Sequence, residues 1–315
     1  MVTGSSGHLG EGLVKHLKQQ GHHVIGYDLL PSADTDVVGN LLDETLLDHI
    51  MTGIEVVFHT ATLHKPHIIS HSAHAFLMNN VMATEVLLRI AVKHQIKAFI
   101  FTSTTSSFGE ALAPKSQTAA SWIDEKTQPI PKNIYGVSKI MAENLCQLAY
   151  KEHGLPCIIL KTSRFFPEAD DMSHTMPEYT QDNLKAIEFL YRRVDLSDVV
   201  KAHEKAMHHA PEIGFDQFII SATTPFSRDD CSSLLKHAPQ VLASYYPNYE
   251  AVFKKLHWQM FPSIDRVYCN RKARTTLGWE PKYDFKTVLG NLSQNKPLLS
   301  TFAYEIGEKG YHRKV

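Results

Sequence analysis

MVTGSSGHLG, residues 1–10 of the chain, holds three glycines spaced three residues apart: Gly4, Gly7 and Gly10. An ordinary surface turn needs one glycine, so three at this spacing predict a turn where the backbone closely approaches a ligand. The N–H groups of such a turn and the dipole of a following helix favour a pyrophosphate. Only residues 1–3 precede the turn, so either the natural chain starts upstream or the fold accepts a very short first strand.

Strand and helix patterns alternate after this turn. Short apolar, β-branched or aromatic runs predict buried strands, and amphipathic runs between them predict helices. The predicted strands are 22–28, 55–61, 98–104 and 157–162, and the predicted helices are 10–20, 80–95 and 138–154. This alternation predicts an α/β fold with a Rossmann-type, doubly wound parallel sheet.

The alternation ends near Phe165, and the chain becomes polar and irregular before a helix at 194–210 and a strand at 218–222. We therefore expect a dinucleotide-binding domain over residues 1–163, to which the chain returns at about 190–222. Residues 164–315 should form mainly a smaller α/β substrate lobe.

The composition is that of an ordinary globular protein: 315 residues, 43% hydrophobic, 21% charged and a formal net charge of -1. Such a balance gives no global attraction to nucleic acid or to an anionic membrane. We find no uninterrupted run of 18 apolar residues, and we therefore exclude a transmembrane helix and membrane attachment. The four cysteines are widely spaced and match neither a disulfide framework nor a zinc pattern, which predicts a cytoplasmic protein.

Histidines gather in one stretch of the chain. His59, His64, His67, His71 and His74 surround a proline and have no acidic residue nearby. A metal site would require helical pairs or Cys/His knuckles backed by carboxylates. We therefore predict no metal site and interpret these residues as solvated or hydrogen-bonded loop histidines.

Asp28 closes the predicted second strand, 18 residues after Gly10. An acid at this place accepts hydrogen bonds from the adenosine ribose of a dinucleotide and repels a 2′-phosphate. No arginine stands beside it, which favours NAD over NADP. The alternative is that Asp28 is a simple turn residue at the end of a strand.

A second pattern is Tyr135 followed four residues later by Lys139, which places both on one helix face. A nearby ammonium would favour the phenolate, so we expect the pKa of Tyr135 to be lowered toward neutrality. Thr102 and Thr104 end the preceding strand, where open parallel sheets bind ligands. A routine exposed tyrosine–lysine pair is the alternative.

Together these motifs resemble the extended short-chain dehydrogenase/reductase family, and within it the NAD-dependent nucleotide-sugar epimerase/dehydratase branch that includes UDP-glucose 4-epimerases. The matching stretches are TGSSGHLG (3–10), Asp28, TSTTSSFG (102–109), YGVSK (135–139), RRVDLSDVVKAH (192–203) and RKARTTLGWEPKYDF (271–285).

The resemblance implies a role for each matching residue. Thr104, Tyr135 and Lys139 would be catalytic, with Tyr135 as the general acid and base. The implied cofactor-binding residues are Gly4, Ser6, Gly7, His8, Leu9, Gly10, Asp28, Asn40, Leu41, Thr60, Ala61, Thr62, Asn80, Thr102, Tyr135 and Lys139. Arg164, Arg192 and Arg266 are candidates for binding a substrate phosphate.

The implied activity is epimerisation of a nucleotide sugar through a transient keto intermediate, with NAD regenerated in each turnover. Dehydratases of this branch carry Thr-Asp-Glu where this chain has Thr104, Thr105 and Ser106, which disfavours dehydration. The insert after Pro167 is short and acidic, which also allows an NAD(P)-dependent reductase or dehydrogenase of a smaller carbonyl or alcohol. A non-catalytic NAD-binding regulator is the third alternative.

Relatives commonly pair as homodimers through a four-helix interface. In this chain that interface would include MAENLCQLAYKEHG (141–154). The same apolar face could instead be buried within the monomer.

Overall fold

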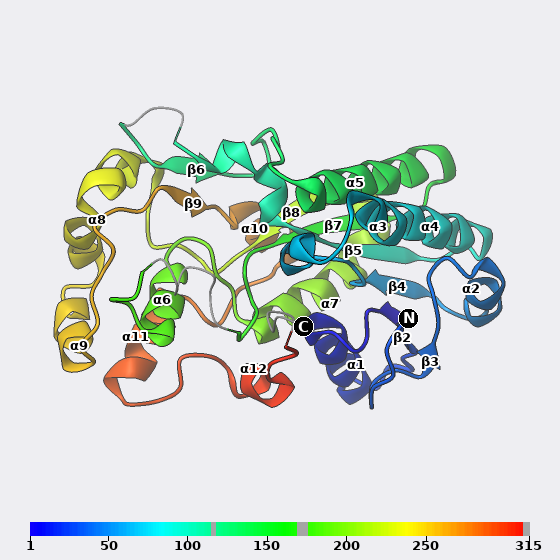
Figure 1. The fold of residues 1–315 in the computed structure, drawn as a ribbon, viewed down its shortest axis with the longest axis horizontal. Helices are drawn as coiled ribbons and strands as arrows, with labels where there is room; N and C mark the ends of the chain where they lie inside the picture. The colour runs from blue at the N-terminus through cyan, green and yellow to red at the C-terminus, as the bar shows by residue number, and fades with distance from the viewer. Residues whose placement is uncertain (115–117, 169–175, 311–315) are drawn as a thin grey trace.

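The computed structural model describes residues 1–114, 118–168 and 176–310. Its centre is a seven-stranded sheet in which every pair of neighbours is parallel (Figure 1). In spatial order the strands are β3 (Val37–Val38), β2 (Gly26–Asp28), β1 (Val2–Thr3), β4 (Val56–His59), β5 (Ala98–Thr104), β7 (Cys157–Thr162) and β8 (Phe215–Ile220). The Rossmann-type, doubly wound parallel sheet is thereby confirmed.

Helices cover both faces of the sheet, and Figure 1 shows the two layers above and below it. One layer contains α1 (His8–Gln19), α7 (Leu196–Ile213) and α12 (Thr301–Ile306), which pack together. The other contains α2 (Glu44–Ile50), α4 (Ala83–Lys93) and α5 (Ile134–His153). Because helices bury the central strands on both faces, all seven residues of β5 are buried.

The strand before the glycine turn is only two residues long, yet it lies in the middle of the sheet. Val2 pairs with Gly26 on one side and with Phe58 on the other. Because β1 offers so few partners, β2 starts at Gly26 instead of at residue 22 as expected.

The smaller lobe is assembled from short elements that the sequence patterns did not resolve. Its two-stranded parallel sheet joins β6 (Ser121–Ile123) to β9 (Arg266–Tyr268), so the first 163 residues also contribute a strand to this lobe. The helices of this part are α6 (Gln181–Glu188), α8 (Cys231–Tyr245), α9 (Tyr249–Lys255), α10 (Arg271–Leu277) and α11 (Phe285–Ser293).

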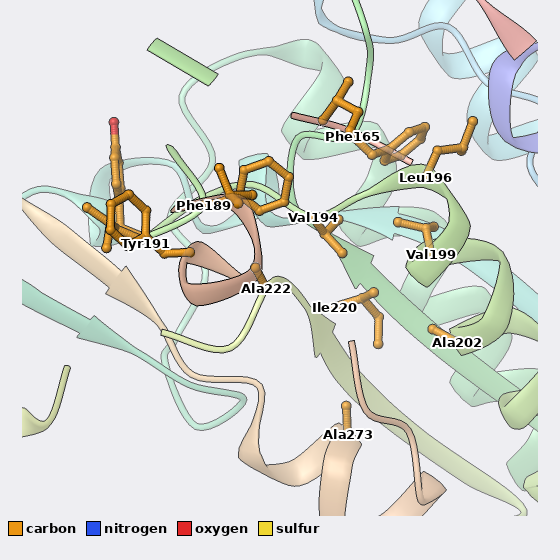
Figure 2. Close-up of a cluster of buried hydrophobic side chains, with 14 of the residues drawn as sticks. Phe165, Phe189, Tyr191, Val194, Leu196, Val199, Ala202, Ile220, Ala222 and Ala273 are labelled. Carbon is orange, nitrogen blue, oxygen red and sulfur yellow. The ribbon is translucent and has the colours of Figure 1, made fainter. Parts of the chain in front are cut away.

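An apolar cluster joins the lobe to the large sheet. Figure 2 shows Phe189, Val194 and Leu196 in this cluster together with Ile220 at the end of β8. All four side chains are buried. The chain between α6 and α7 is thereby held in a single path, which places the arginines it carries.

One helical stretch corrects our exclusion of a membrane-spanning helix. Residues Ala73–Lys93 run continuously through α3 (Ala73–Phe76), a π-helical turn (Leu77–Met82) and α4, and they contain an apolar window of 18 residues. By length and composition this stretch could cross a membrane. Half of that apolar window is buried inside the fold. Core helices of soluble proteins have the same length and composition, so the stretch is weak evidence for a membrane span.

Candidate active site

The glycine turn between β1 and α1 is closed so tightly that two of its glycines have no room for a side chain. A Cβ on Gly10 would lie 1.9 Å from the carbonyl oxygen of Gly4, and one on Gly4 would lie 2.7 Å from the amide nitrogen of Ala61. Gly4 also has a φ of +76°. No side chain caps the first turn of α1 at Gly7, so the start of the helix is suited to an anionic group.

A cavity of about 750 Å³ begins at this turn and extends over the carboxyl ends of the strands into the smaller lobe. That volume lies within the usual range of ligand sites. The residues expected at the site that line this cavity are Gly4, Ser6, Gly7, His8, Leu9, Gly10, Asp28, Asn40, Leu41, Thr60, Ala61, Thr62, Thr102, Thr104, Tyr135, Arg164, Arg192 and Arg266. Of the described residues that we expected at the site, Asn80 and Lys139 do not line the cavity.

Asp28 stands at the end of β2, at the rim of this cavity. Its carboxylate accepts hydrogen bonds from the backbone N–H groups of Ser6 and Leu30, each at 3.0 Å. A carboxylate has about four acceptor sites. Asp28 can therefore hold the turn and still accept hydrogen bonds from a ligand diol.

Asn80 has a different place from the one expected of a residue that contacts the cofactor. Its side-chain amide accepts a hydrogen bond from Leu63 N–H at 2.8 Å and donates to Leu63 O and to the Ser138 hydroxyl. It is buried. Asn80 therefore links the loop after β4 to α5, so it shapes the cavity from behind.

Thr104 and Tyr135 meet in the cavity although 31 positions separate them. Thr104 is the last residue of β5, and Tyr135 lies in the first turn of α5, which Asn133 caps. The Thr104 side chain lies within reach of the Tyr135 hydroxyl and acts on the pKa of that phenol as a hydrogen-bond partner. This places a phenol and an alcohol side by side at the carboxyl end of the sheet, where ligands bind in such folds.

The prediction that Lys139 lowers the pKa of Tyr135 is wrong for the protein without a bound ligand. Burial raises the pKa of Tyr135 to about 12, with the hydrogen bond to Thr104 opposing the rise. Burial also lowers the pKa of Lys139 from 10.5 to about 7, against the attraction of Glu143. Desolvation outweighs the neighbouring charge because both side chains are enclosed.

A buried ion pair lies one helical turn beyond Lys139. The Lys161 Nζ contacts both carboxylate oxygens of Glu143 at 2.6 Å and donates to the Ser107 hydroxyl at 3.3 Å. Ser103, beside Thr104 on β5, donates to the same carboxylate. The ion pair thus joins α5, β5 and β7 directly behind the Thr104–Tyr135 pair.

The far end of the cavity carries the three candidate substrate arginines. The guanidiniums of Arg192 and Arg266 lie 5.6 and 5.8 Å from the centre of the same Tyr191 ring. Arg192 also pairs with Glu188 at 2.5 Å, and Arg266 pairs with Asp265 at 2.8 Å. Arg164 follows the end of β7.

Imidazoles form a wall of the cavity that our interpretation as loop histidines missed. His64 is buried and stacks on Phe166 at 5.5 Å between ring centres, and His67 packs against its edge. His8 makes an edge contact with Phe166 at 5.2 Å between ring centres and pairs with Glu168 at 2.8 Å. The sequence signal that could have revealed this wall was the apolar and aromatic residues near the histidines, and not a metal-binding pattern.

His59 is also not a loop residue. It lies in β4, where its ring is hydrogen-bonded to the hydroxyls of Thr3 and Thr84, and burial lowers its pKa to about 3. Within the ranges that the structure describes, no three His, Cys, Asp or Glu side chains are grouped so that they could hold a metal ion.

Comparison with known proteins places these observations in one family. The model of the NAD dependent epimerase/dehydratase family matches residues 1–215. The chain is 31% identical over 188 residues to the uncharacterized UDP-glucose epimerase YtcB of Bacillus subtilis, and this match covers 53% of the chain and 55% of that relative. A UDP-glucose 4-epimerase of Halalkalibacterium halodurans is 27% identical over 320 residues, 90% of each chain.

Solved structures share the fold. The UDP-glucuronic acid 4-epimerase of Bacillus cereus, in complex with NAD, superposes with a TM-score of 0.64 at 19% identity and covers 94% of this chain and 99% of its own. A short-chain dehydrogenase/reductase superfamily protein from Agrobacterium tumefaciens with bound NAD gives a TM-score of 0.64 at 22% identity, covering 93% and 95%.

Proposed function

Because this chain belongs to the NAD dependent epimerase/dehydratase family, we propose that it inverts one carbinol carbon of a nucleotide sugar. It is an enzyme of the extended short-chain dehydrogenase/reductase type with NAD as its cofactor. UDP-glucose 4-epimerases among its relatives support a nucleotide sugar as the substrate. The choice of epimerisation rests on the side chains of the cavity.

The cavity suits NAD at its first end. Gly4 and Gly10 let the turn close against the start of α1, whose uncapped N–H groups suit a pyrophosphate, and Asp28 would bind the adenosine ribose. When bound, NAD supplies the acceptor and donor of hydride. The hydroxyl of Thr60 donates to Thr3 O, which keeps the loop after β4 in place beside the glycine turn.

Tyr135 would move the proton of the substrate hydroxyl. With a pKa of about 12 in the protein alone, its phenol holds the proton at neutral pH beside the Thr104 side chain. Lys139, on the same face of α5, would stabilise the phenolate when it is charged. Thr104 would hold the reacting oxygen close to the phenol.

The observation that carries the proposal is the Thr104–Tyr135 pair in a cavity whose lining gives it no acidic neighbour. The carboxylates that line the cavity, among the described residues, are Asp28 and Asp265. Asp28 stands at the glycine turn, and Asp265 is paired with Arg266. Elimination of water requires an acid and a base near the sugar, so this lining favours epimerisation over dehydration.

A panel of UDP-, GDP- and dTDP-sugars tests the proposal. We expect isomer conversion, followed by chromatography, without net NADH at 340 nm. Tyr135→Phe should lower kcat by about 10²- to 10⁴-fold while NAD remains bound. Tyr150→Phe, at the exposed side of the same helix, is the matched control. Stoichiometric NADH would identify a dehydrogenase instead, and no conversion of any sugar would overturn the proposal.

We propose in addition that the enzyme is a homodimer that pairs through α5. Met141 and Leu148 on this helix are 41% and 47% exposed, whereas Ala142 and Cys146 are buried in the monomer. The helix thus keeps an exposed apolar face in the folded monomer.

A cytoplasmic location stays a prediction. The four cysteines, all in the described residues, are free thiols.

A further inference from the structure

A chain of hydrogen bonds between buried side chains runs from the glycine turn to the helix that carries the catalytic phenol. It crosses from β1 to β4, then to the helical stretch that contains α4, and ends at α5, which packs against α4 (Figure 1). Its members, in order, are Thr3, His59, Thr84, Asn80 and Ser138. All five are buried, and none of them lines the cavity. Their role must therefore be exerted through other residues.

The ring of His59 is neutral and has a single tautomer. Burial and, to a lesser degree, the charge of Lys139 lower the pKa of His59 to about 3, so one ring nitrogen carries a hydrogen at neutral pH. The Thr84 hydroxyl donates its only hydrogen to Asn80 O at 2.7 Å, so at its 2.9 Å contact with His59 Nε2 it accepts. Nε2 therefore carries the hydrogen, and Nδ1 accepts from the Thr3 hydroxyl at 2.8 Å.

One end of the chain holds the glycine turn. Thr3 directly precedes Gly4, and it is the register partner of His59 in the sheet. The Thr3 hydroxyl also accepts from Ala61 N–H at 3.4 Å, and its carbonyl accepts from the Thr60 hydroxyl at 2.7 Å. The ring of His59 is thereby tied to the turn and to the loop after β4, both of which line the cavity.

The other end holds the first turn of α5. Thr84 binds the backbone of Asn80, whose side-chain amide donates to the Ser138 hydroxyl at 3.0 Å. This hydroxyl donates in turn to Tyr135 O at 2.9 Å. The same amide exchanges two hydrogen bonds with the backbone of Leu63. The helical turn that presents the phenol is thus connected to His59 through hydrogen bonds alone.

The two ends carry the two parts of the cavity that must stay at a fixed distance. The glycine turn would hold NAD, and Tyr135 would move the proton of the substrate hydroxyl. A misplacement of about 1 Å costs on the order of 100-fold in rate. We propose that His59 is a positioning residue, whose two ring nitrogens hold the phenol of Tyr135 in register with the glycine turn. This inference rests on the proposed function, which assigns the roles of the turn and the phenol.

Replacing His59 with each of the two carboxamides separates the two ends. Asparagine places its polar atoms near the position of Nδ1 and glutamine near that of Nε2, so His59→Asn can keep the partner of Thr3 and His59→Gln that of Thr84. We expect His59→Asn to lower kcat by about 10- to 100-fold and to change the Kd for NAD by less than about 2-fold. His59→Gln should weaken NAD binding by about 3- to 10-fold and keep kcat, at saturating NAD, within about 3-fold of the wild type.

Thr84→Val and Thr84→Ser are matched variants in the middle of the chain. Valine has the shape of threonine without its hydroxyl, so Thr84→Val should lower kcat as His59→Asn does, whereas Thr84→Ser keeps the hydroxyl and should retain it. Hydrogen exchange of residues 134–138, measured by mass spectrometry, is a readout that needs no turnover. It should be faster than in the wild type for Thr84→Val and His59→Asn, and unchanged for Thr84→Ser and His59→Gln.

Isothermal titration with NAD gives the affinity, and chromatography of UDP-glucose and its isomer gives kcat. Far-UV circular dichroism verifies that each variant is folded, and the Thr84 variants decide the question if a His59 variant is not. Parallel losses of NAD affinity and kcat in both His59 variants, or the same loss in Thr84→Ser as in Thr84→Val, would overturn the positioning role alone. If the wild type converts none of the UDP-, GDP- and dTDP-sugars, the proposed function falls, and the exchange and NAD-binding comparisons still decide the role of His59.

Discussion

At the scale of the residue, Lys139 shows how burial changes the pKa of a side chain. Only 2% of its surface is exposed, and its ammonium lies 4.1 Å from the centre of the Phe101 ring. Tyr135 precedes it by one helical turn, as the sequence spacing predicts. The spacing determines which side chains are neighbours, whereas the enclosure by the sheet determines their protonation.

This burial predicts how stability depends on pH. The pKa of Lys139 is about 7 in the folded protein and 10.5 when exposed, so between these values the unfolded chain binds more protons. The free energy of unfolding should therefore rise with pH from 7 to 9, by up to about 1.4 kcal/mol per pH unit. Urea unfolding of the wild type and of Lys139→Met measures this contribution as the difference between their slopes.

The control for this experiment is Lys151→Met, which removes an exposed lysine from the same helix. The window ends at pH 9 so that Tyr135, whose pKa is about 12, stays protonated throughout. Equal slopes for the wild type and Lys139→Met would show that Lys139 titrates normally.

Gly10 is a position where a single methyl group should be decisive. Its Cβ would lie 1.9 Å from Gly4 O, so Gly10→Ala must open the turn. We expect a loss of about 1–3 kcal/mol in the free energy of unfolding and a loss of stabilisation by added NAD. Thermal denaturation with and without NAD measures both effects.

Gly290→Ala provides the comparison, because nothing lies within 4 Å of its added methyl group. Gly290 is in α11, where alanine is the better helix former by about 0.5–1 kcal/mol. A neutral or stabilising Gly290→Ala beside a destabilising Gly10→Ala supports the steric account. An unaffected Gly10→Ala protein would contradict the closed turn.

The contact between α5 and β7 depends, at the scale of the element, on the buried Glu143–Lys161 pair. Removing one partner leaves a buried charge without its counter-ion, so Glu143→Gln and Lys161→Met should each cost about 3–5 kcal/mol of stability. The double variant Glu143→Leu/Lys161→Met should cost much less than the sum. Urea unfolding of the single and double variants gives the coupling energy.

The exposed pair Glu55–Lys97 is the matched control for this cycle, since its side chains are about two-thirds exposed. Water screens such a pair, so its removal should change stability little. Strict additivity at Glu143 and Lys161 would mean that the two charges do not stabilise each other.

The elements that the sequence predicts best are those buried on both faces. The predicted strands 98–104 and 157–162 coincide with β5 and β7 because their apolar runs match the length of their ladders. The patterns failed for β3, β6 and β9, which are only two or three residues long. Such strands depend on the chain they pair with, and local periodicity carries no information about it.

The cavity exists only at the scale of the whole molecule, because its two ends belong to different parts of the chain. Asp28 and Arg266 line the same cavity although 238 positions separate them. β9 contributes Arg266 and Tyr268 to the cavity lining, and it pairs with β6 in the smaller lobe. The arrangement allows a dinucleotide and a second ligand to meet at Tyr135.

The proposed dimer predicts a mass twice that of the chain in size-exclusion chromatography with light scattering. Met141→Glu should convert it to a monomer, because a charge would be buried in an apolar interface. Lys151→Glu, which alters an exposed polar position of the same helix, is expected to remain dimeric. A monomeric wild-type protein would show that the exposed apolar face of α5 has another use.

The sequence by itself determined the sheet and its glycine turn, because period, glycine spacing and a strand-end acid are local properties of the chain. The resemblance of its motifs to a family led us to expect Thr104, Tyr135 and the three arginines at the site, and all five line one cavity. Only the tertiary structure decided the rest: the raised pKa of Tyr135, the role of Asn80 and the histidine wall. These depend on which distant side chains exclude water, and desolvation is a property of the packed molecule.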